Sequence, residues 1–499
     1  MTQGPKRADG RADVTAVISA VFDEDSFSSW DVGPLQPAAG EEYREALARA
    51  AARAGRDESV VTGTAVLAGL RVAVVAGEFG FLAGSVGMAA ADRVTAALRR
   101  ATLEGLPVVA FPTSGGTRMQ EGTPAFLRMV PVAAAVQRHR SAGLPYVVWL
   151  RDPTTGGVMA TWGSLGQVTA AAPGALAGFL GPRVFEAMRG EEFPSGVQVA
   201  EHLADVGVID AVVALRDVRA WLMDVLDVLG AGGEADGNGA PHGLELPAAD
   251  PDGWDCVVAT RSPARPGAAE LLAACGARVT YLTGTGAGER GEGVLIALAR
   301  IGGTACVVAA QDRRVGSFGP AGLRAARRAY RLAAELRLPL LTVVDTEGAE
   351  VSAAAEEGAM AGEIARSLAD LATLPTPVVS VLLGSGCGGG ALAMLPGDIV
   401  LAAADAWVTP LPPEGASAIL HRTVDRAPEL ARDQQITAVG LARRGVVDAL
   451  LVAPGDDPAG FLAAVGAAAG AALHRATADF ALRGAPDPRR VDRFVAVPQ

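Results

Sequence analysis

The chain contains two copies of one pattern, and this duplication constrains its fold more than any other feature of the sequence. VLAGLRVAVVAG at 66–77 has a counterpart in ARIGGTACVVAA at 299–310. The turn TSGGT at 113–117 corresponds to DTEGA at 345–349, and a proline opens the next apolar run in each copy, Pro145 and Pro377. These matches lie roughly 232 residues apart, as expected for a duplicated domain.

Short apolar runs rich in β-branched residues alternate with stretches of helical periodicity in both copies. This alternation is typical of α/β domains, in which helices cover the strands of a sheet. We predict strands at 72–75, 108–111, 146–150, 305–309, 340–344 and 378–383, and helices at 41–56, 89–104, 125–140, 216–229, 323–336, 353–371, 391–395 and 459–475.

The boundaries follow from shifts in composition along the chain. Residues 230–253 (GAGGEADGNGAPHGLELPAADPDG) are rich in Gly, Pro, Ala and acidic side chains, and we interpret them as a linker. The first domain is then 21–229 and the second 254–485, at ordinary to large domain size. Residues 1–20 are expected to be a loose, disordered tail, and 486–499 a second tail rich in Pro and Arg.

Composition excludes several classes of function. The net charge of −12 argues against nucleic acid as a partner, and no apolar run reaches the roughly 18–20 residues that a membrane span needs. Lys6 is the only lysine, so the domains contain no P-loop, no Schiff-base lysine and no attachment point for biotin. A carrier cofactor would arrive on another protein. The polar N-terminus and four cysteines without CxxC spacing indicate a reducing, cytoplasmic compartment.

Two glycine pairs are the strongest candidates for chemistry. Gly156-Gly157 and Gly389-Gly390 each follow an apolar strand and precede a probable helix. Two backbone N–H groups at a helix N-terminus can hold an oxygen that gains negative charge, with help from the helix dipole. The alternative is that glycine lets the helix pack closely on the sheet. Because both pairs occupy matching places in a duplicated domain, the sequence favours the catalytic reading.

Other groups give weaker signals. None of the five histidines adjoins a serine or cysteine in a nucleophile elbow, and Ser385 and Cys387 have no evident base. Carboxylates at 345–357 match no metal-binding loop, so we expect them to be solvated and expect no metal site. The run GTGAGERG at 284–291 departs from GxGxxG, which favours a flexible turn over a dinucleotide site.

Several motifs resemble the carboxyltransferase component of acyl-CoA carboxylases. In the first half, SGGTRMQEG at 114–122 is similar to the SGGARMQEG of bacterial β subunits, and EFGFLAGSVGM at 78–88, DPTTGGV at 152–158 and PGALAGFLGPR at 173–183 also match. In the second half, WDCVVATRSPARP at 254–266, the glycine run at 384–393, PEGA at 413–416 and TAVGLARRGVVDA at 437–449 are similar to the α subunit. The resemblance covers about residues 20–455, in the order of fused β–α chains.

The resemblance implies two tandem crotonase-like (ClpP-like) ββα-superhelix domains. Family members move CO₂ from carboxybiotin to the α-carbon of an acyl-CoA, most simply acetyl-CoA giving malonyl-CoA, with propionyl-CoA as another possible substrate. Gly156-Gly157 would hold the enolate oxygen of the thioester and Gly389-Gly390 the ureido oxygen of biotin. Substrate-binding residues are expected at Gly84, Ser85, Gly115, Gly116, Arg118, Gly348, Glu414 and Gly415.

The same resemblance implies the partners. Biotin would come on a separate carrier protein joined to a biotin carboxylase subunit, and the coenzyme A thioester would be the substrate. Active sites formed between halves of different subunits imply a homo-oligomer, a hexamer built as a ring of dimers. Two loops depart from the family: the α-type DTPGAYPG is DTEGAEVS at 345–352, and the β-type LPEGFQ is FPSGVQ at 193–198.

Two other functions fit the same residues. An intact first glycine pair with an altered 345–352 loop would allow a biotin-independent malonyl-CoA-type decarboxylase. A non-catalytic subunit that scaffolds a carboxylase complex through its duplicated domain is the other alternative. Loss of CO₂ without a carrier would identify the decarboxylase, and recovery with an active paralogue would identify the scaffold.

Overall fold

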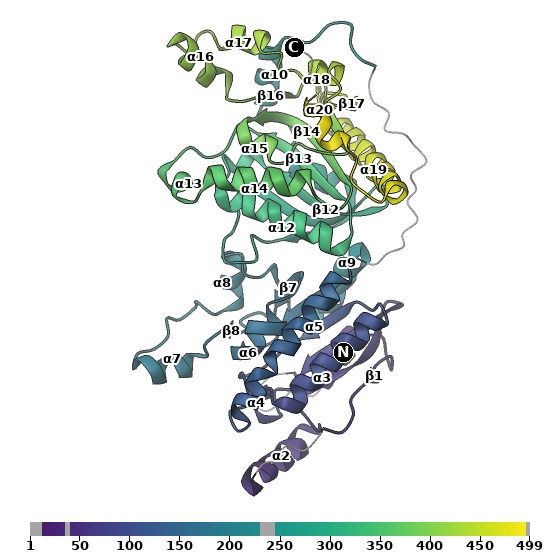
Figure 1. Ribbon diagram of the computed structural model, residues 1–499, viewed down its shortest axis with the longest axis vertical. Helices are drawn as coiled ribbons and strands as arrows, with labels where there is room; N and C mark the ends of the chain where they lie inside the picture. The colour runs from purple at the N-terminus through teal and green to yellow at the C-terminus, as the bar shows by residue number, and fades with distance from the viewer. Residues whose placement is uncertain (1–11, 35–39, 230–244, 496–499) are drawn as a thin grey trace. The chain divides into compact units, whose positions relative to one another are not determined.

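The computed structural model describes residues 12–34, 40–229 and 245–495 (Figure 1). The chain divides into two compact units, residues 1–227 and 228–499. The division falls just before the expected linker, whose residues 230–244 lie outside the described part of the chain.

The first unit is built on a seven-stranded sheet whose central strands are buried. Two strands form an antiparallel hairpin, and parallel strands follow, which accounts for the continuous apolar runs in the sequence. The predicted strands 108–111 and 146–150 coincide with β4 and β5. The sheet order is β1 (Ser28–Ser29), β2 (Val60–Leu67), β3 (Leu70–Gly77), β4 (Val108–Phe111), β5 (Tyr146–Leu150), β7 (Val168–Ala171) and β9 (Ala211–Val212).

Helices cover this sheet, and two of them, α3 and α5, pack against each other over it (Figure 1). The predicted helix 125–140 is divided at Arg128 into α4 and α5. Two short strands, β6 (Thr154–Thr155) and β8 (Ala177–Gly178), form a separate ladder. The helices are α1 (Val14–Val21), α2 (Glu41–Ala54), α3 (Met88–Leu103), α4 (Gly122–Leu127), α5 (Met129–Ser141), α6 (Gly156–Val158), α7 (Pro182–Arg189), α8 (Ala200–Asp205) and α9 (Leu215–Leu229).

The prediction of a loose tail over residues 1–20 is wrong for its last part. Asp13 caps α1 by accepting a hydrogen bond from the N–H of Ala16 at 2.8 Å. The N–H of Val14 donates to Glu78 at 3.0 Å, and the apolar face of α1 is buried. The VxxV spacing of this face carried the signal in the sequence.

The second unit repeats the design with eight strands. An antiparallel hairpin again precedes parallel strands. In both units the first parallel pairing joins the fourth residue of the second hairpin strand to the first residue of the next strand, Ala73 to Val108 and Val307 to Leu340. The order is β10 (Gly276–Leu282), β11 (Val294–Ile301), β12 (Thr304–Gln311), β13 (Leu340–Thr346), β14 (Val378–Cys387), β15 (Ile399–Ala403) and β17 (Ala449–Leu451), while β16 (Trp407–Thr409) also pairs with β14.

Helices α12 and α14 pack together in this unit, and α12 and α19 both contact the sheet (Figure 1). The predicted helix 353–371 is divided into α13 and α14, and Ala359 between them has a left-handed φ of 63°. The helices are α10 (Gly253–Thr260), α11 (Ala268–Cys275), α12 (Pro320–Leu336), α13 (Ala353–Glu357), α14 (Met360–Ala372), α15 (Gly388–Leu392), α16 (Pro413–His421), α17 (Ala427–Asp433), α18 (Ala438–Arg443), α19 (Pro458–Arg483) and α20 (Arg489–Val495).

The predicted C-terminal tail is also wrong within the described residues, because α20 is anchored by buried arginines. Arg490 is 1% exposed and forms an ion pair with Asp398 at 2.7 Å. Its guanidinium also donates to the carbonyls of Leu374 and Thr376, each at 2.7 Å. A charged side chain can be buried when it is fully hydrogen-bonded in this way.

Helix α19 bears on the expectation that no apolar run is long enough to span a membrane. It is long and apolar enough to cross a membrane by length and composition, although half of its most apolar window is buried. Phe461, Val465 and Leu473 lie on its buried face, and α19 contacts α11 and four strands of the sheet. These contacts are those of a core helix.

Candidate functional site

Only the second member of the first glycine pair has a free amide. Gly156 has a φ of 63°, a conformation that favours glycine, and its N–H donates to the carbonyl of Phe179 at 2.9 Å. The N–H of Gly157, at the start of α6, has no acceptor among the described residues. Gly157 is therefore the member of the pair that can bind an oxygen.

A neighbouring loop supplies a second free amide. The Oγ of Ser114 accepts the N–H of Gly116 at 2.9 Å, and Gly116 has a φ of 115°. Beyond it, Val86 and Thr117 form an isolated parallel bridge, in which the N–H of Val86 donates to Gly116 at 3.0 Å. The N–H of Thr117 takes no part in that bridge and has no acceptor in the described chain.

Thr117 and Gly157 are neighbours across this site. A Cβ added to Gly157 would lie 3.0 Å from the Oγ1 of Thr117 and 3.2 Å from the Sδ of Met129. Gly116 and Gly156 approach similarly, with an added Cβ on Gly156 only 3.0 Å from the Cα of Gly116. Two adjacent unpaired N–H groups are the arrangement that stabilises a developing oxyanion. Sequence reasoning found Gly157 but missed Thr117.

Gly84, Ser85 and Gly115 build the wall of this site. Gly84 has a φ of 66°, and an added Cβ would lie 2.6 Å from the carbonyl oxygen of Thr113. The N–H of Gly115 donates to the carbonyl of Ala83 at 2.9 Å. The structure therefore brings these predicted residues together, and at Gly84 the close backbone approach requires glycine.

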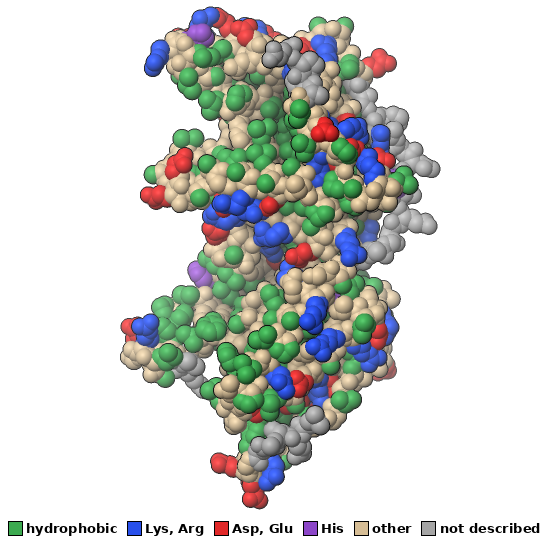
Figure 2. Space-filling view, in the orientation of Figure 1, with side chains coloured by type: hydrophobic (Ala, Val, Ile, Leu, Met, Phe, Trp, Pro, Cys, Tyr) green, Lys and Arg blue, Asp and Glu red, His purple; other side chains and the backbone are tan. Residues whose placement is uncertain are grey.

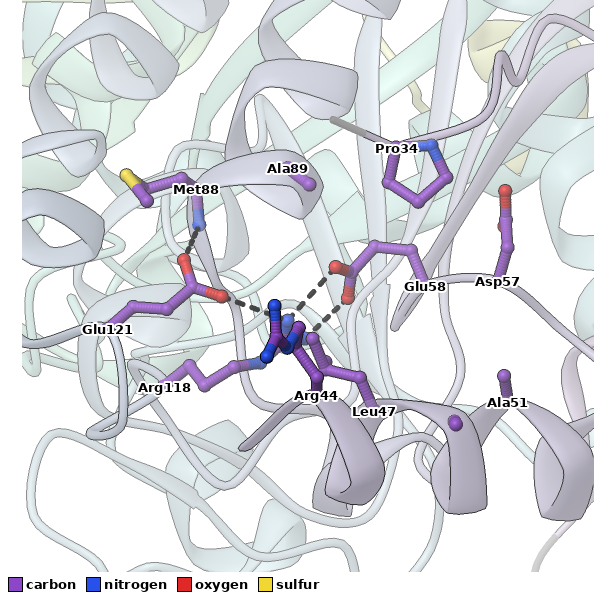
Figure 3. A pocket seen from close by; sticks show the side chains of 11 residues that line it. Pro34, Arg44, Leu47, Ala51, Asp57, Glu58, Met88, Ala89, Arg118 and Glu121 are labelled. Atoms are coloured by element: carbon purple, nitrogen blue, oxygen red, sulfur yellow. Dashed lines mark hydrogen bonds and ion pairs between the residues drawn. The ribbon is translucent and has the colours of Figure 1, made fainter. Parts of the chain in front are cut away.

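Arg118 is buried and pairs with glutamates from two different loops (Figure 3). It is 1% exposed, and its guanidinium contacts Glu58 and forms an ion pair with Glu121 at 3.3 Å. It also donates to the carbonyl of Ser85 at 2.7 Å. The donors of the guanidinium are engaged by these partners, so the charge of Arg118 holds the loops of the first site together, and its role in binding substrate stays a prediction. Beside it lies a cavity of about 290 Å³ under α2, lined partly by Leu47.

The second glycine run repeats this geometry with a shift of one residue. Gly388 has a φ of 69° and is the counterpart of Gly156, so Gly389 is the counterpart of Gly157. The N–H of Gly389 has no acceptor among the described residues. The sequence-based pairing of Gly156-Gly157 with Gly389-Gly390 is therefore one residue out of register.

Gly390 serves packing. An added Cβ would lie 2.4 Å from the Cζ of Phe318, and the carbonyl of Gly390 accepts from Nε2 of Gln311 at 2.8 Å. The first unit has Val158 and Val86 at the corresponding positions, both in its buried core. The second unit thus pairs a large side chain, Phe318, with a glycine where the first unit pairs two valines, which keeps the packed volume similar.

The loop before the second site also matches the first. The N–H of Gly348 donates to Oγ1 of Thr346 at 3.1 Å, and Gly348 has a φ of 126°. Phe318 and Ala349 form the parallel bridge that corresponds to Val86 and Thr117. Ala349 is therefore the counterpart of Thr117, and its N–H has no acceptor in the described residues.

Charged side chains surround the second site. Glu414 accepts two hydrogen bonds from Arg261, at 2.6 and 3.2 Å, and these bonds lower the pKa of the Glu414 carboxyl. Nothing lies within 4 Å of a Cβ added to Gly415. Behind the loop, burial raises the pKa of Asp345 to about 6, although Arg313 lies 3.1 Å away. Arg261 was not predicted as a site residue.

The remaining candidates are structural. Burial raises the pKa of Cys387 to about 12, so its thiol is protonated at neutral pH and is no nucleophile. Burial lowers the pKa of His139 to about 4, and its Nε2 lies 3.1 Å from the carbonyl of Pro145. Among the described residues no group of three His, Cys, Asp or Glu side chains could hold a metal. Residues 284–291 form a turn between β10 and β11.

Comparison with known proteins gives the family. Residues 5–444 match the Carboxyl transferase domain. A probable biotin-dependent acyl-coenzyme A carboxylase beta3 subunit of Mycobacterium tuberculosis is 52% identical over 484 residues, 95% of each chain. The acetyl-coenzyme A carboxylase carboxyl transferase subunits beta/alpha of Salinispora tropica is 36% identical, over 90% of this chain and 83% of that protein.

Solved structures share the fold. Transcarboxylase 12S, solved as a hexamer with methylmalonyl-coenzyme A, superposes with a TM-score of 0.75 over 92% of this chain and 89% of its own, at 19% identity. A single-chain, multi-domain long-chain acyl-CoA carboxylase superposes with a TM-score of 0.73 over 92% of this chain and 46% of its own, at 22% identity. These structures confirm the prediction of two crotonase-like α/β domains.

The chain belongs to the carboxyl transferase family. This confirms the prediction, made from its motifs, of an enzyme of the acyl-CoA carboxylase carboxyltransferase type.

Proposed function

We propose that the chain transfers a carboxyl group between biotin, carried on a separate protein, and the α-carbon of a short acyl-CoA. The observation that carries this proposal is that backbone N–H groups without an acceptor among the described residues recur at corresponding places in the two units, at Thr117 and Gly157 and at Ala349 and Gly389. A transfer between two carbonyl-bearing partners needs two oxygens stabilised, one in each.

In the first unit, the amides of Thr117 and Gly157 would bind the thioester oxygen. Removing a proton from the α-carbon of an acyl-CoA puts negative charge on that oxygen, and the two N–H groups offset it. Because the amides are fixed by the Gly116 turn and α6, they need no reorganisation during the reaction. The two amides would contribute charge stabilisation and positioning.

In the second unit, the residues fit a cyclic urea such as that of biotin. The free amides of Ala349 and Gly389 can receive its carbonyl oxygen, and a cavity of about 310 Å³ lies beside Gly348. Biotin would supply the carrier for the carboxyl group. The chain would hold the ring against these amides, while Gly348 keeps the approach free of a side chain.

We infer that the acyl group is short and that acetyl-CoA is the substrate, giving malonyl-CoA, with propionyl-CoA the nearest alternative. Support comes from Met129, whose thioether lies against Gly157, and from the naming of acetyl-CoA among similar proteins. A biotin carboxylase subunit and its biotinylated carrier would be the partners, in the cytoplasm.

A homo-oligomer, a ring of dimers, is proposed from the surface of each unit. The first unit exposes apolar side chains, among them Met119, Phe126, Val130, Phe179 and Met188. Green side chains gather over α4 and near α7 (Figure 2). In the second unit Leu392, Leu411, Ile419, Leu420 and Val424 are exposed. Apolar patches of this kind mark interaction surfaces.

The reverse reaction tests the proposal. Purified protein is incubated with malonyl-CoA, with and without free biocytin, and acetyl-CoA release is followed. Release that depends on biocytin is expected. Equal release without biocytin would instead establish the decarboxylase, and release from methylmalonyl-CoA alone would move the acyl preference to propionyl-CoA. No release from either thioester, followed by recovery with an active paralogue, would establish the scaffold.

A further inference from the structure

We propose that Gln311 is a positioning residue of the second site, which fixes the turn that carries Ala349 against the helix start that carries Gly389. Gln311 is the last residue of β12 and is 1% exposed. Its Oε1 accepts the N–H of Asp345 at 3.2 Å, and its Nε2 donates to the carbonyl of Gly390 at 2.8 Å. Asp345 begins the turn, and Gly390 follows Gly389 in α15. One buried side chain therefore bonds both segments whose amides have no acceptor among the described residues.

A second link joins the same two segments on the other side of Gly389. Oδ1 of Asp345 accepts the N–H of Ser385 at 3.1 Å. Ser385 lies four residues before Gly389 in the chain, and Gly390 lies one residue after it. The amide of Gly389 thus lies between two points at which its segment is bonded to the turn or to Gln311. Asp345 belongs to both links, because its N–H donates to Gln311 and its carboxylate accepts from Ser385.

The first unit makes the corresponding junction without a glutamine. The matching strand pairings place Gly77, the last residue of β3, at the position of Gln311. A Cβ added to Gly77 would lie 2.8 Å from the backbone nitrogen and 2.8 Å from the backbone oxygen of Thr113, the counterpart of Asp345. The two backbones therefore touch directly in the first unit, and no side chain fits between them.

The second link is also replaced in the first unit. Oγ1 of Thr113 lies within hydrogen-bond distance of the carbonyl oxygens of Asp152 and Pro153, at 3.3 and 3.2 Å. Pro153 is the counterpart of Ser385 and has no N–H to donate. Because the first unit reaches the same fold with other contacts, the fold itself does not require Gln311. Its two hydrogen bonds are therefore a feature of the second site.

The inference rests on the proposed function, because it gives Gln311 the task of aligning the amides that would hold the ureido oxygen. A glutamine amide presents a donor and an acceptor in one plane, so its two bonds set the separation between the turn and the helix start. Catalytic groups must be held within about 0.5 Å of the productive geometry, and a displacement of about 1 Å can cost about 10²-fold in rate. We expect loss of both bonds to lower kcat by about 10- to 100-fold.

Gln311→Met tests the inference, because methionine is close to glutamine in size and flexibility but lacks the amide. Gln311→Asn is a second variant, whose amide is one methylene too short to reach both partners. The matched control is Gln167→Met in the first unit. Gln167 is also 1% exposed and accepts the N–H of Tyr146 at 2.9 Å, so this variant removes a comparable buried amide from the other unit.

Two measurements are made on the whole chain. Hydrogen–deuterium exchange of peptides covering 345–352 and 384–393 reports the two segments without turnover, and biocytin-dependent release of acetyl-CoA from malonyl-CoA reports kcat. We expect both Gln311 variants to exchange faster in both peptides and to lose about 10- to 100-fold in kcat, with the affinity for malonyl-CoA within about twofold of the wild type.

Three results would overturn the inference: unchanged exchange in both peptides, a kcat within about threefold of the wild type, or a loss of malonyl-CoA affinity as large as the loss in kcat. Equal effects in Gln167→Met would overturn it as well. Absence of biocytin-dependent release in the wild type would refute the proposed function instead, and the exchange measurement would still decide whether Gln311 holds the two segments together.

Discussion

Replacing Gly157 by alanine separates the chemistry of the first site from its folding. The added Cβ meets Oγ1 of Thr117 at 3.0 Å and Sδ of Met129 at 3.2 Å, and both are side-chain atoms that can shift by a few tenths of an ångström. Alanine also has a better helix propensity than glycine by up to about 1 kcal/mol. We therefore expect an unfolding midpoint close to that of the wild type.

Turnover should respond very differently. The new methyl group crowds Oγ1 of Thr117 and Sδ of Met129 beside the free amide of Gly157, where the thioester oxygen would bind under the proposed function. Loss of one oxyanion donor costs about 10²–10³ in kcat, or about 2.7–4 kcal/mol. The assay is biocytin-dependent release of acetyl-CoA from saturating malonyl-CoA, with circular dichroism to confirm folding.

Gly181→Ala is the control for this experiment, because nothing lies within 4 Å of the Cβ that it adds. Gly156→Ala is unsuitable, since its φ of 63° strains any other residue whatever its role in catalysis. The reasoning is refuted if Gly157→Ala turns over within threefold of the wild type, a change far below the about 10² expected. It is also refuted if Gly181→Ala loses as much activity.

Gly390→Ala should destabilise the protein by about 1–3 kcal/mol, since its Cβ would lie 2.4 Å from the ring of Phe318, and Phe318→Val should relieve most of this cost in a double-mutant cycle measured with urea. Arg490→Ala should cost about 3–5 kcal/mol in free energy of unfolding, because it leaves the buried carboxylate of Asp398 unpaired. Burial raises the pKa of Asp345 from 3.8 to about 6, so the carboxyl takes up a proton on folding. The stability of the wild type relative to Asp345→Asn should therefore be greatest below about pH 3.8 and fall as the pH rises through about 6, in urea titrations at stepped pH.

Each of these has an outcome that counts against it. Additive costs in the Gly390 and Phe318 cycle would mean that the two residues do not compete for space. Arg426 forms an exposed pair with Glu429, and Arg426→Ala should cost at most about 1 kcal/mol, so a similar loss in both arginine variants would contradict the role of burial. A stability difference for Asp345→Asn that rises with pH would show that the attraction of Arg313 outweighs burial.

The sequence predicted the scaffold well, because the duplication and the buried strands depend on local patterns. Strands 108–111 and 146–150 lie where predicted, and the turn at 345–349 repeats the one at 113–117 down to its glycine with positive φ. The helices at both ends were missed. The VxxV spacing of Val14–Val21 was a local signal that we did not use, whereas Arg489–Val495 is short and depends on a tertiary contact with Asp398.

The site was predicted in part. Gly157 and Gly389 emerged from their place after a strand, but Thr117 and Ala349 did not, because a free backbone N–H leaves no trace in residue type. Holding the offset between the two copies at the 232 residues of the preceding turn would have aligned Gly156 with Gly388 and shown that Gly390 has a valine as its counterpart. The charge of Arg118 is matched by Glu58, a partner that lies far away in sequence and could not be predicted from local pattern.

The central claim is that paired amides from a turn and a helix start hold the reacting oxygens. Its most direct test is a cryo-EM structure of the protein with acetyl-CoA bound. The account predicts the thioester oxygen about 2.7–3.1 Å from the backbone nitrogens of both Thr117 and Gly157. An ordered thioester whose oxygen contacts neither amide, or one held by the side chain of Arg118, would contradict it.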